Sequence, residues 1–232
     1  MRKKAVLTIY VEGGGDNRAL PLECQQAFRR FFERAGLPKG SFMVYASGSR
    51  KAAYEDYCFA RENGENALLL VDAEDPIKLD RSTERPVAPW QHLAERAGDQ
   101  WARPSGASPD EVQLMAPVME AWFMADVVAL AAYYAGKFGR EAFNATALPK
   151  RANVDQLTKD EIESALANAT RQNKSKGLYH KGRHSFDILA SLDPVAVARG
   201  SYHARRLLCH LKEVLKAAAS MMWLDCTEFV AL

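Results

Sequence analysis

Three carboxylates lie just beyond the ends of two apolar runs of the sequence, at 5–11 and 67–71. Glu12 follows the first run, and Asp72 and Glu74 follow the second. Such runs predict buried strands, and ligands of open α/β sheets bind outside the carboxyl ends of these strands. Hard cations such as Mg²⁺ or Mn²⁺ prefer carboxylate and water oxygens and favour phosphate substrates. We therefore predict that these three side chains form a Mg²⁺ or Mn²⁺ site.

Two other acids could extend this site. Asp75 is a further candidate metal ligand, although the whole acidic segment could instead be a solvated loop that turns before Pro76. Glu120 is the one charged residue of the apolar stretch 119–125. It is either a catalytic acid that faces the same crevice or an exposed acid favoured by the dipole of a helix start. We expect Trp122 beside it to belong to the core.

Two segments have the composition of phosphate-binding loops. Gly13 and Gly14 either let the backbone turn sharply or present their N–H groups to an anion. The second segment opens a helix after a predicted strand and contains Ser47, Ser49, Arg50 and Lys51. Hydroxyls, backbone N–H groups and cations at a helix start can hold phosphate. The alternative is an N-cap followed by two solvated cations.

The segment 171–184 contains five Lys and Arg residues and no acid. Such a patch predicts contact with a nucleic-acid backbone, and the alternative is a solvated surface. The candidates for phosphate contact are Lys174, Lys176 and Arg183. His180 and His184 have the spacing of a zinc pair, but no Glu follows His180 and Gly182 is expected to interrupt the helix, so zinc is not predicted.

The bulk composition indicates a globular protein without a strong overall charge. The chain has 232 residues, of which 48% are hydrophobic, and its 31 basic residues nearly balance its 29 acidic ones. Attraction to phosphate must therefore come from local patches. The four cysteines form no Cys-x-x-Cys pair, which predicts reduced thiols rather than a zinc ribbon or disulfides. We find no signal peptide and no membrane span, and predict a cytoplasmic protein without a membrane partner.

The first half of the sequence alternates strand-like and helix-like segments. Strands are predicted at 5–11, 42–46, 67–71 and 112–115, and helices at 20–35, 50–63 and about 90–97. This alternation predicts an α/β fold with a mostly parallel four-stranded sheet and helices on both faces.

The second half is predicted to be mainly helical. We divide the chain into an α/β core, 1–117, with an inserted loop at 76–109, and a helical region, 118–232, that packs on it. Its helices are predicted at 118–134, 158–172 and 201–222, the second with a capping box at Thr158 and Glu161. The apolar tail, 220–232, either folds back on its own core or covers a partner.

Four short motifs, in order along the chain, resemble known families. They are Val11-Glu12-Gly13, Val71-Asp72-Ala73-Glu74-Asp75-Pro76, Met119-Glu120-Ala121-Trp122-Phe123-Met124-Ala125-Asp126 and Lys181-Gly182-Arg183-His184. They resemble the Toprim (Rossmann-like) fold of topoisomerases, primases and overcoming-lysogenization-defect nucleases. More closely, they resemble the bacterial domain of unknown function family DUF4276, which is considered Toprim-related.

The Toprim resemblance implies roles for single residues. Glu12 would act in acid/base or metal chemistry, while Asp72 and Glu74 would hold the metal. Glu74 stands where many Toprim proteins have Asp, and its longer arm should shift the ion slightly. Toprim nucleases carry a late lysine near the metals, and Lys181 is the counterpart here and a candidate catalytic residue.

These observations lead to a functional hypothesis. We expect a metal-dependent nuclease that hydrolyses phosphodiesters, with DNA favoured over RNA. The resemblance also implies a companion ATPase in a bacterial anti-phage defence system, and self-association is left open. The alternatives are a catalytically silent binding or sensor module that docks on an ATPase, and a nucleotide phosphohydrolase.

Overall fold

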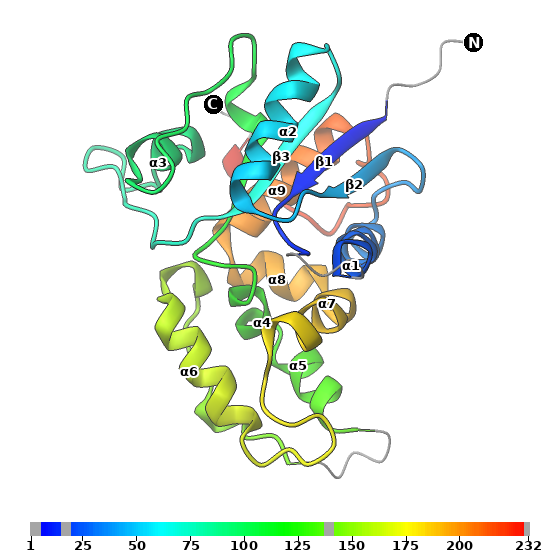
Figure 1. Ribbon diagram of the computed structural model, residues 1–232, viewed down its shortest axis with the longest axis vertical. Helices are drawn as coiled ribbons and strands as arrows, with labels where there is room; N and C mark the ends of the chain where they lie inside the picture. The colour runs from blue at the N-terminus through cyan, green and yellow to red at the C-terminus, as the bar shows by residue number, and fades with distance from the viewer. Residues whose placement is uncertain (1–5, 15–19, 137–141, 230–232) are drawn as a thin grey trace.

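The protein contains one four-stranded, all-parallel sheet. The computed structural model describes residues 6–14, 20–136 and 142–229. The strands are β1 (Leu7–Val11), β2 (Phe42–Ala46), β3 (Ala67–Asp72) and β4 (Val112–Met115), in the order β2-β1-β3-β4 (Figure 1). All four strands were predicted, because buried parallel strands read as continuous apolar runs.

Helices cover both faces of the sheet. Leu68 and Leu70 of β3 pack on one face in the same cluster as the aromatic residues of α1 (Leu20–Ala35). Leu69 and Val71 point to the other face and pack with α2 (Arg50–Glu62). This alternation follows from the period of two along a strand. The predicted α/β architecture is therefore confirmed.

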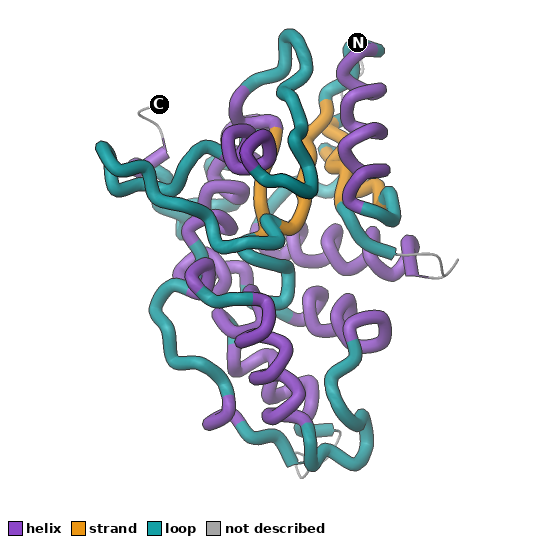
Figure 2. Tube along the Cα trace, turned by 60° about the vertical axis from the view of Figure 1, so that its left-hand side comes forward, coloured by secondary structure: helices purple, strands orange, loops and turns teal. Residues whose placement is uncertain are grey.

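The remaining helices follow the sheet in sequence, apart from α3 in the insertion between β3 and β4. The α-helices are α3 (Pro89–Glu95), α4 (Ala121–Ala125), α5 (Val127–Tyr134), α6 (Lys159–Thr170), α7 (Lys181–Ser191), α8 (Pro194–Gly200) and α9 (Tyr202–Val214). Short 3₁₀ turns lie at Pro109–Glu111, Ala145–Ala147, Val154–Gln156 and Thr227–Phe229. Helices α4 to α7 lie below the carboxyl ends of the strands in Figure 1, and Figure 2 shows the same helical part from the side.

The helical region packs on the sheet through one continuous core. Trp122 of α4 is fully buried, as predicted, and stacks on Phe31 of α1 with ring centroids 5.2 Å apart. The same cluster includes Ile162 of α6, Ile188 of α7 and Leu207 of α9. The helices that carry the later site residues are thus held rigidly against the strand ends.

Three predicted helix boundaries in this region are wrong. The helix expected at 118–134 breaks at Asp126, because this side chain caps α5 through Ala129 N and also accepts the N–H of Asp193, at 2.7 Å. The helix expected to reach 222 ends at Val214 and is followed by Lys216 with a positive φ of 54°. Gly182 does not interrupt a helix, since it lies in the first turn of α7.

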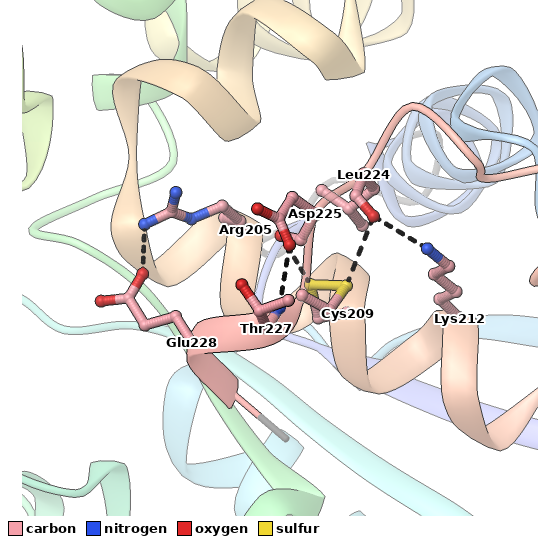
Figure 3. Close-up of a disulfide and its surroundings, with 8 residues drawn as sticks. Arg205, Cys209, Lys212, Leu224, Asp225, Thr227 and Glu228 are labelled. Carbon is pink, nitrogen blue, oxygen red and sulfur yellow. Dashed lines mark hydrogen bonds and ion pairs between the residues drawn. A yellow bond between two sulfur atoms is a disulfide. The ribbon is translucent and has the colours of Figure 1, made fainter. Parts of the chain in front are cut away.

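The prediction of four reduced thiols is also wrong. Cys209 on α9 and Cys226 in the tail form a disulfide, with their Cα atoms 5.6 Å apart (Figure 3). Their separation of 17 residues shows no motif in the sequence; the turn after α9 brings them together. Arg205 and Lys212 hold the same tail segment through Glu228 and the carbonyl of Leu224.

The described part of the tail folds back on the protein. Met221 and Leu224 are buried, and Trp223 donates its indole N–H to the carbonyl of Ala35 at 3.2 Å. This is the first of the two alternatives for the tail; residues 230–232 lie outside the described part. Across the described residues, no helix combines the length and apolar character that a membrane crossing requires.

Candidate metal centre

The ends of β1 and β3 bring three acids together. Carboxylate oxygens of Glu12, Asp72 and Glu74 lie within 4.8 Å of one another, and we call these residues the acid group. Glu12 follows β1, Asp72 ends β3, and Glu74 lies two residues beyond. The neighbouring parallel strands of the sheet are the reason that acids 60 residues apart meet.

Backbone groups fix each acid in place. Asp72 donates its N–H to Glu12 Oε2 at 3.1 Å, and its own Oδ1 accepts the N–H of Met119 at 2.7 Å. Glu74 has a positive φ of 68°, which few residues other than glycine adopt, and its N–H donates to Pro117 O at 2.7 Å. Such a backbone conformation is held only when the surroundings determine it, and it occurs often at functional sites.

Burial and mutual repulsion make the acid group costly to ionise. Burial raises the pKa of Glu12, although the positive charge of Arg50 opposes this. The pKa of Asp72, which is 2% exposed, is raised well above its usual value by burial and by the negative charge of Glu12. A bound cation would relieve both effects, and three converging hard oxygen donors suit Mg²⁺ or Mn²⁺.

Each acid also has its own cationic partner. Arg50 Nη1 lies 3.3 Å from Glu12, Lys181 Nζ lies 3.8 Å from Asp72, and Lys159 Nζ lies 2.9 Å from Glu74. These partners come from α2, α7 and α6, respectively. Each of the three carboxylates is therefore in contact with a cation of the protein.

Lys181 also contacts a fourth acid at this site. Its Nζ lies 3.5 Å from Glu120 Oε2, and Tyr179 donates its hydroxyl to Glu120 Oε1 at 2.9 Å. Burial alone would lower the pKa of Lys181, but the carboxylates of Glu120 and Asp72 outweigh it and raise this pKa. Glu120 stands at the start of α4 but is buried, so the alternative of an exposed acid at a helix start is wrong.

Two cavities flank Lys181. One has a volume of about 280 Å³ and is lined by Glu12, Asp72, Gly14, Met119 and Phe186, among others. The other has a volume of about 270 Å³ and lies between α6 and the segment before α7, with Glu120 and Leu166 in its wall. Lys181 lines both, so an anionic group beside Lys181 could extend into either one.

The two glycines allow close packing next to the acid group. Gly13 has φ 140° and Gly14 has φ 100°, and a Cβ on either would approach α1 to 2.8 Å, at Cys24 Sγ or at the Pro21 backbone. The N–H of Gly13 donates to the carbonyl of Gly48 at 2.9 Å. These contacts support the turn alternative for Gly13, and phosphate contact at both glycines remains a prediction.

The other predicted phosphate ligands lie at different distances from the site. Ser49 is the N-cap of α2 and accepts from Ala52 N at 3.1 Å. Ser47 Oγ is buried without a hydrogen-bond partner among the described residues. Lys51 is exposed and pairs with Glu55. Arg50 is the member of this set that reaches the acid group.

The remaining candidates do not join the acid group. Asp75 is 64% exposed at its side chain and pairs with Arg96, 2.9 Å away. Lys176 lies over the ring of Tyr133, with Nζ 3.8 Å from the centroid, and Lys174 and Arg183 are exposed on the same segment. A metal role for Asp75 and nucleic-acid contacts for the three cations stay predictions.

Three residues at the site were not predicted from the sequence. Lys159 is an ordinary residue of the first turn of α6, and Tyr179 is an aromatic residue of the basic segment without a motif of its own. Asp99 in the insertion is 2% exposed at its side chain and binds Arg50 through both oxygens. Asp99 is notable as a buried charge on a loop, but its burial is seen only in the structure and not in the sequence.

The comparisons with known proteins identify a family. The model of the domain of unknown function (DUF4276) matches residues 11–212 of this chain. Nothing among curated proteins matches the chain. Nothing among solved structures matches it either. The matched range contains the acid group, its three cationic partners and Glu120.

Proposed function

The chain belongs to the DUF4276 family, and we propose that it is a metal-dependent phosphodiesterase of Toprim type that acts as a nuclease. The observation that carries this proposal is the convergence of the acid group, within 4.8 Å, beside Lys181. Carboxylates can hold the metal ion of a phosphoryl-transfer site, and a nearby lysine can stabilise the charge that develops on the phosphate.

Charge balance favours an anionic substrate. Three cations of the protein already contact the acid group, although Lys181 is shared with Glu120 and Arg50 with Asp99. A divalent cation held by Glu12, Asp72 and Glu74 would add two positive charges beside Lys159 and Lys181. Phosphate groups are the common biological anions that such a site attracts.

The protein's own residues then have distinct roles. A Mg²⁺ or Mn²⁺ ion, when bound, would polarise the phosphate and lower the pKa of a water. Glu12 would hold the cation through one carboxylate oxygen and accept a proton from the attacking water at the other. Lys181 would donate from Nζ to a phosphate oxygen as negative charge develops. Glu120 and Tyr179 would hold that ammonium group in position.

The biological setting in this proposal comes from the resemblance. Nucleic acid, with DNA favoured over RNA, is the substrate, and an ATPase is the companion subunit of an anti-phage defence system. The exposed cations Lys174 and Arg183 support a nucleic-acid substrate, because they lie before and after Lys181 in the same basic segment. The cytoplasm as the location remains part of this proposal.

One observation favours a catalytically silent module instead. All three members of the acid group have a cationic partner at 2.9–3.8 Å, so side chains of the protein already contact each carboxylate in the absence of an ion. Such a site could serve as a rigid structural centre in a sensor module. The same cavities would also admit a small phosphate, as a nucleotide phosphohydrolase requires.

One experiment separates these functions. The purified protein is incubated with plasmid DNA, RNA and nucleotides, with and without Mn²⁺. A nuclease cleaves the polymers only with Mn²⁺, and the Glu12→Gln, Asp72→Asn double variant does not cleave them while its circular dichroism stays native. Release of phosphate from nucleotides alone would identify a phosphohydrolase. A folded wild-type protein that binds no Mn²⁺ in calorimetry and turns over none of the three would refute the proposal.

A further inference from the structure

The insertion between β3 and β4 reaches the acid group through one arginine. Asp99 of this insertion accepts from Arg50 Nε at 2.8 Å and from Arg50 Nη2 at 2.7 Å. The remaining terminal nitrogen, Nη1, contacts Glu12 Oε2 at 3.3 Å and the carbonyl oxygen of Asp72. The guanidinium thus uses two nitrogens, Nε and Nη2, in a bidentate contact with Asp99, and only Nη1 faces the acid group.

The surroundings of this ion pair are built and buried. The side chains of Asp99 and Arg50 are 2% and 14% exposed. Arg96 adds a second contact to Asp99 at 3.2 Å. The guanidinium carbon of Arg50 lies 4.9 Å from the ring centroid of Trp101, which stacks on Tyr54. An exposed ion pair contributes little, but a buried bidentate pair fixes both partners.

The orientation of Arg50 has a consequence for Glu12. Arg50 and the backbone N–H of Asp72 each donate a hydrogen bond to the Glu12 carboxylate. Both hydrogen bonds end on Oε2. Among the described residues, Glu12 Oε1 is left without a recorded hydrogen bond, and it keeps its lone pairs for a cation. If Arg50 instead formed a bidentate pair with Glu12, it would bind both carboxylate oxygens, because two N–H groups of a guanidinium align with the two oxygens of a carboxylate.

We propose that Asp99 is a positioning residue that keeps the Nε–Nη2 edge of Arg50 turned away from Glu12, so that one Glu12 oxygen stays available to a divalent cation. This inference rests on the proposed function, because it concerns the same metal centre. It assigns a role to the insertion, which supplies the counter-charge for Arg50. Without Asp99, Arg50 competes with the cation for Glu12.

The test is Mn²⁺ calorimetry on the full-length protein after removal of metal by a chelator. Asp99→Asn is expected to weaken Mn²⁺ binding by about 10- to 100-fold, the usual effect of losing a residue that orients a metal ligand. The double variant Asp99→Asn, Arg50→Gln is expected to bind Mn²⁺ as tightly as the single variant Arg50→Gln. The reason is that the arginine, which competes with Mn²⁺ for Glu12, is absent from both proteins. Glu95→Gln is the control, since it removes an exposed partner of Lys78 on the same insertion.

A second variant keeps the inference testable if Asp99→Asn does not fold. Arg50→Lys retains the charge but cannot form the fork to Asp99, so its Mn²⁺ binding should weaken as well. Wild-type affinity in folded Asp99→Asn or Arg50→Lys would overturn the inference alone. A double variant as weak as Asp99→Asn would also overturn it, because Asp99 would then act only on the fold. A wild-type protein without Mn²⁺ binding would overturn the metal centre and this inference together.

Discussion

The ammonium group of Lys159 lies 2.9 Å from a carboxylate oxygen of Glu74 and joins the first turn of α6 to the end of β3. The pair is partly exposed, with 43% of the lysine side chain accessible, so its contribution to stability is small. Its importance is positional, since it provides one of the three cations that face the acid group. The first prediction tests this relationship.

Replacing Lys159 with Met should raise the affinity for Mn²⁺ a few-fold, because Glu74 loses the cation that competes with the metal. The free energy of unfolding should change by less than about 1 kcal/mol. Calorimetry and urea denaturation measure the two effects. Lys39→Met, which removes an exposed lysine near the end of α1, is the matched control and should change neither. Weaker Mn²⁺ binding in Lys159→Met would show that the lysine supports the metal centre.

Replacing Lys181 with Met should separate chemistry from metal binding. Loss of a donor that stabilises developing charge costs on the order of a hundredfold in rate. Mn²⁺ affinity should stay equal or rise, because Asp72 and Glu120 lose a competing cation. Single-turnover cleavage of a labelled DNA strand and calorimetry provide the readouts. Wild-type cleavage by folded Lys181→Met would exclude a catalytic role for this lysine.

The basic segment predicts a salt-dependent contact with nucleic acid. Changing Lys174 and Arg183 together to Gln should weaken DNA binding and reduce the slope of log affinity against log salt by about one unit per lost phosphate contact. Fluorescence anisotropy at several salt concentrations, with metal replaced by chelator to prevent cleavage, measures this slope. An unchanged slope would identify the segment as a solvated surface.

Asp155 predicts a specific pH dependence of stability away from the metal centre. Burial raises the pKa of this carboxyl group to about 6, although hydrogen bonds from Ser201 and the His203 backbone oppose it. The folded protein therefore binds the proton more tightly than the unfolded chain, so this stabilisation is complete below about pH 4 and is lost as pH rises through about 6.

Asp155→Asn removes this titration. The unfolding free energy of the wild type relative to the variant should be greater at pH 4 than at pH 7, by at most about 3 kcal/mol. Burial lowers the pKa of His203 to about 3, so this group destabilises the fold in acid. Because both proteins contain His203, its contribution to the free energy of unfolding cancels in the comparison. Urea denaturation at both pH values supplies the measurement. A difference that is the same at both pH values would contradict the assigned pKa.

The disulfide predicts a redox-dependent stability. Reduction of Cys209–Cys226, or the Cys226→Ser change, should lower the free energy of unfolding by about 2–4 kcal/mol, the usual effect of opening a bridge over a loop of this length. The fold should remain, because Met221 and Leu224 stay buried against the core. Urea denaturation with and without a reductant tests this. Cys58→Ser is the control, as that cysteine is free in the structure.

The sequence predicted those elements that depend on local pattern. The four strands were recognised because each is a buried apolar run, and α6 because Thr158 and Glu161 form a capping box. The three acids were recognised because strand ends carry ligands. Their convergence required only that β1 and β3 be neighbours in the sheet, which an alternating α/β pattern favours.

The features that were missed depend on contacts between distant segments. The break between α4 and α5 depends on a hydrogen bond from Asp193 to Asp126, 67 residues apart. Helices α7 and α8 were not predicted, since each is short and lies in a polar or mixed stretch. Lys159 and Asp99 have no local signature, because their positions at the site follow from how α6 and the insertion pack. Local rules cannot supply such information.

The origin of the three cations sets an order of events during synthesis of the chain. The acids of the acid group are complete once residue 74 has been made, but Lys159 and Lys181 follow 85 and 107 residues later. A nascent or truncated chain that ends before α6 would hold three facing carboxylates with only Arg50 to balance them. The amino-terminal half therefore lacks two of the three cations that contact the acid group. The charge arrangement of the full fold depends on the helical half, which contributes both lysines from beyond the strand ends.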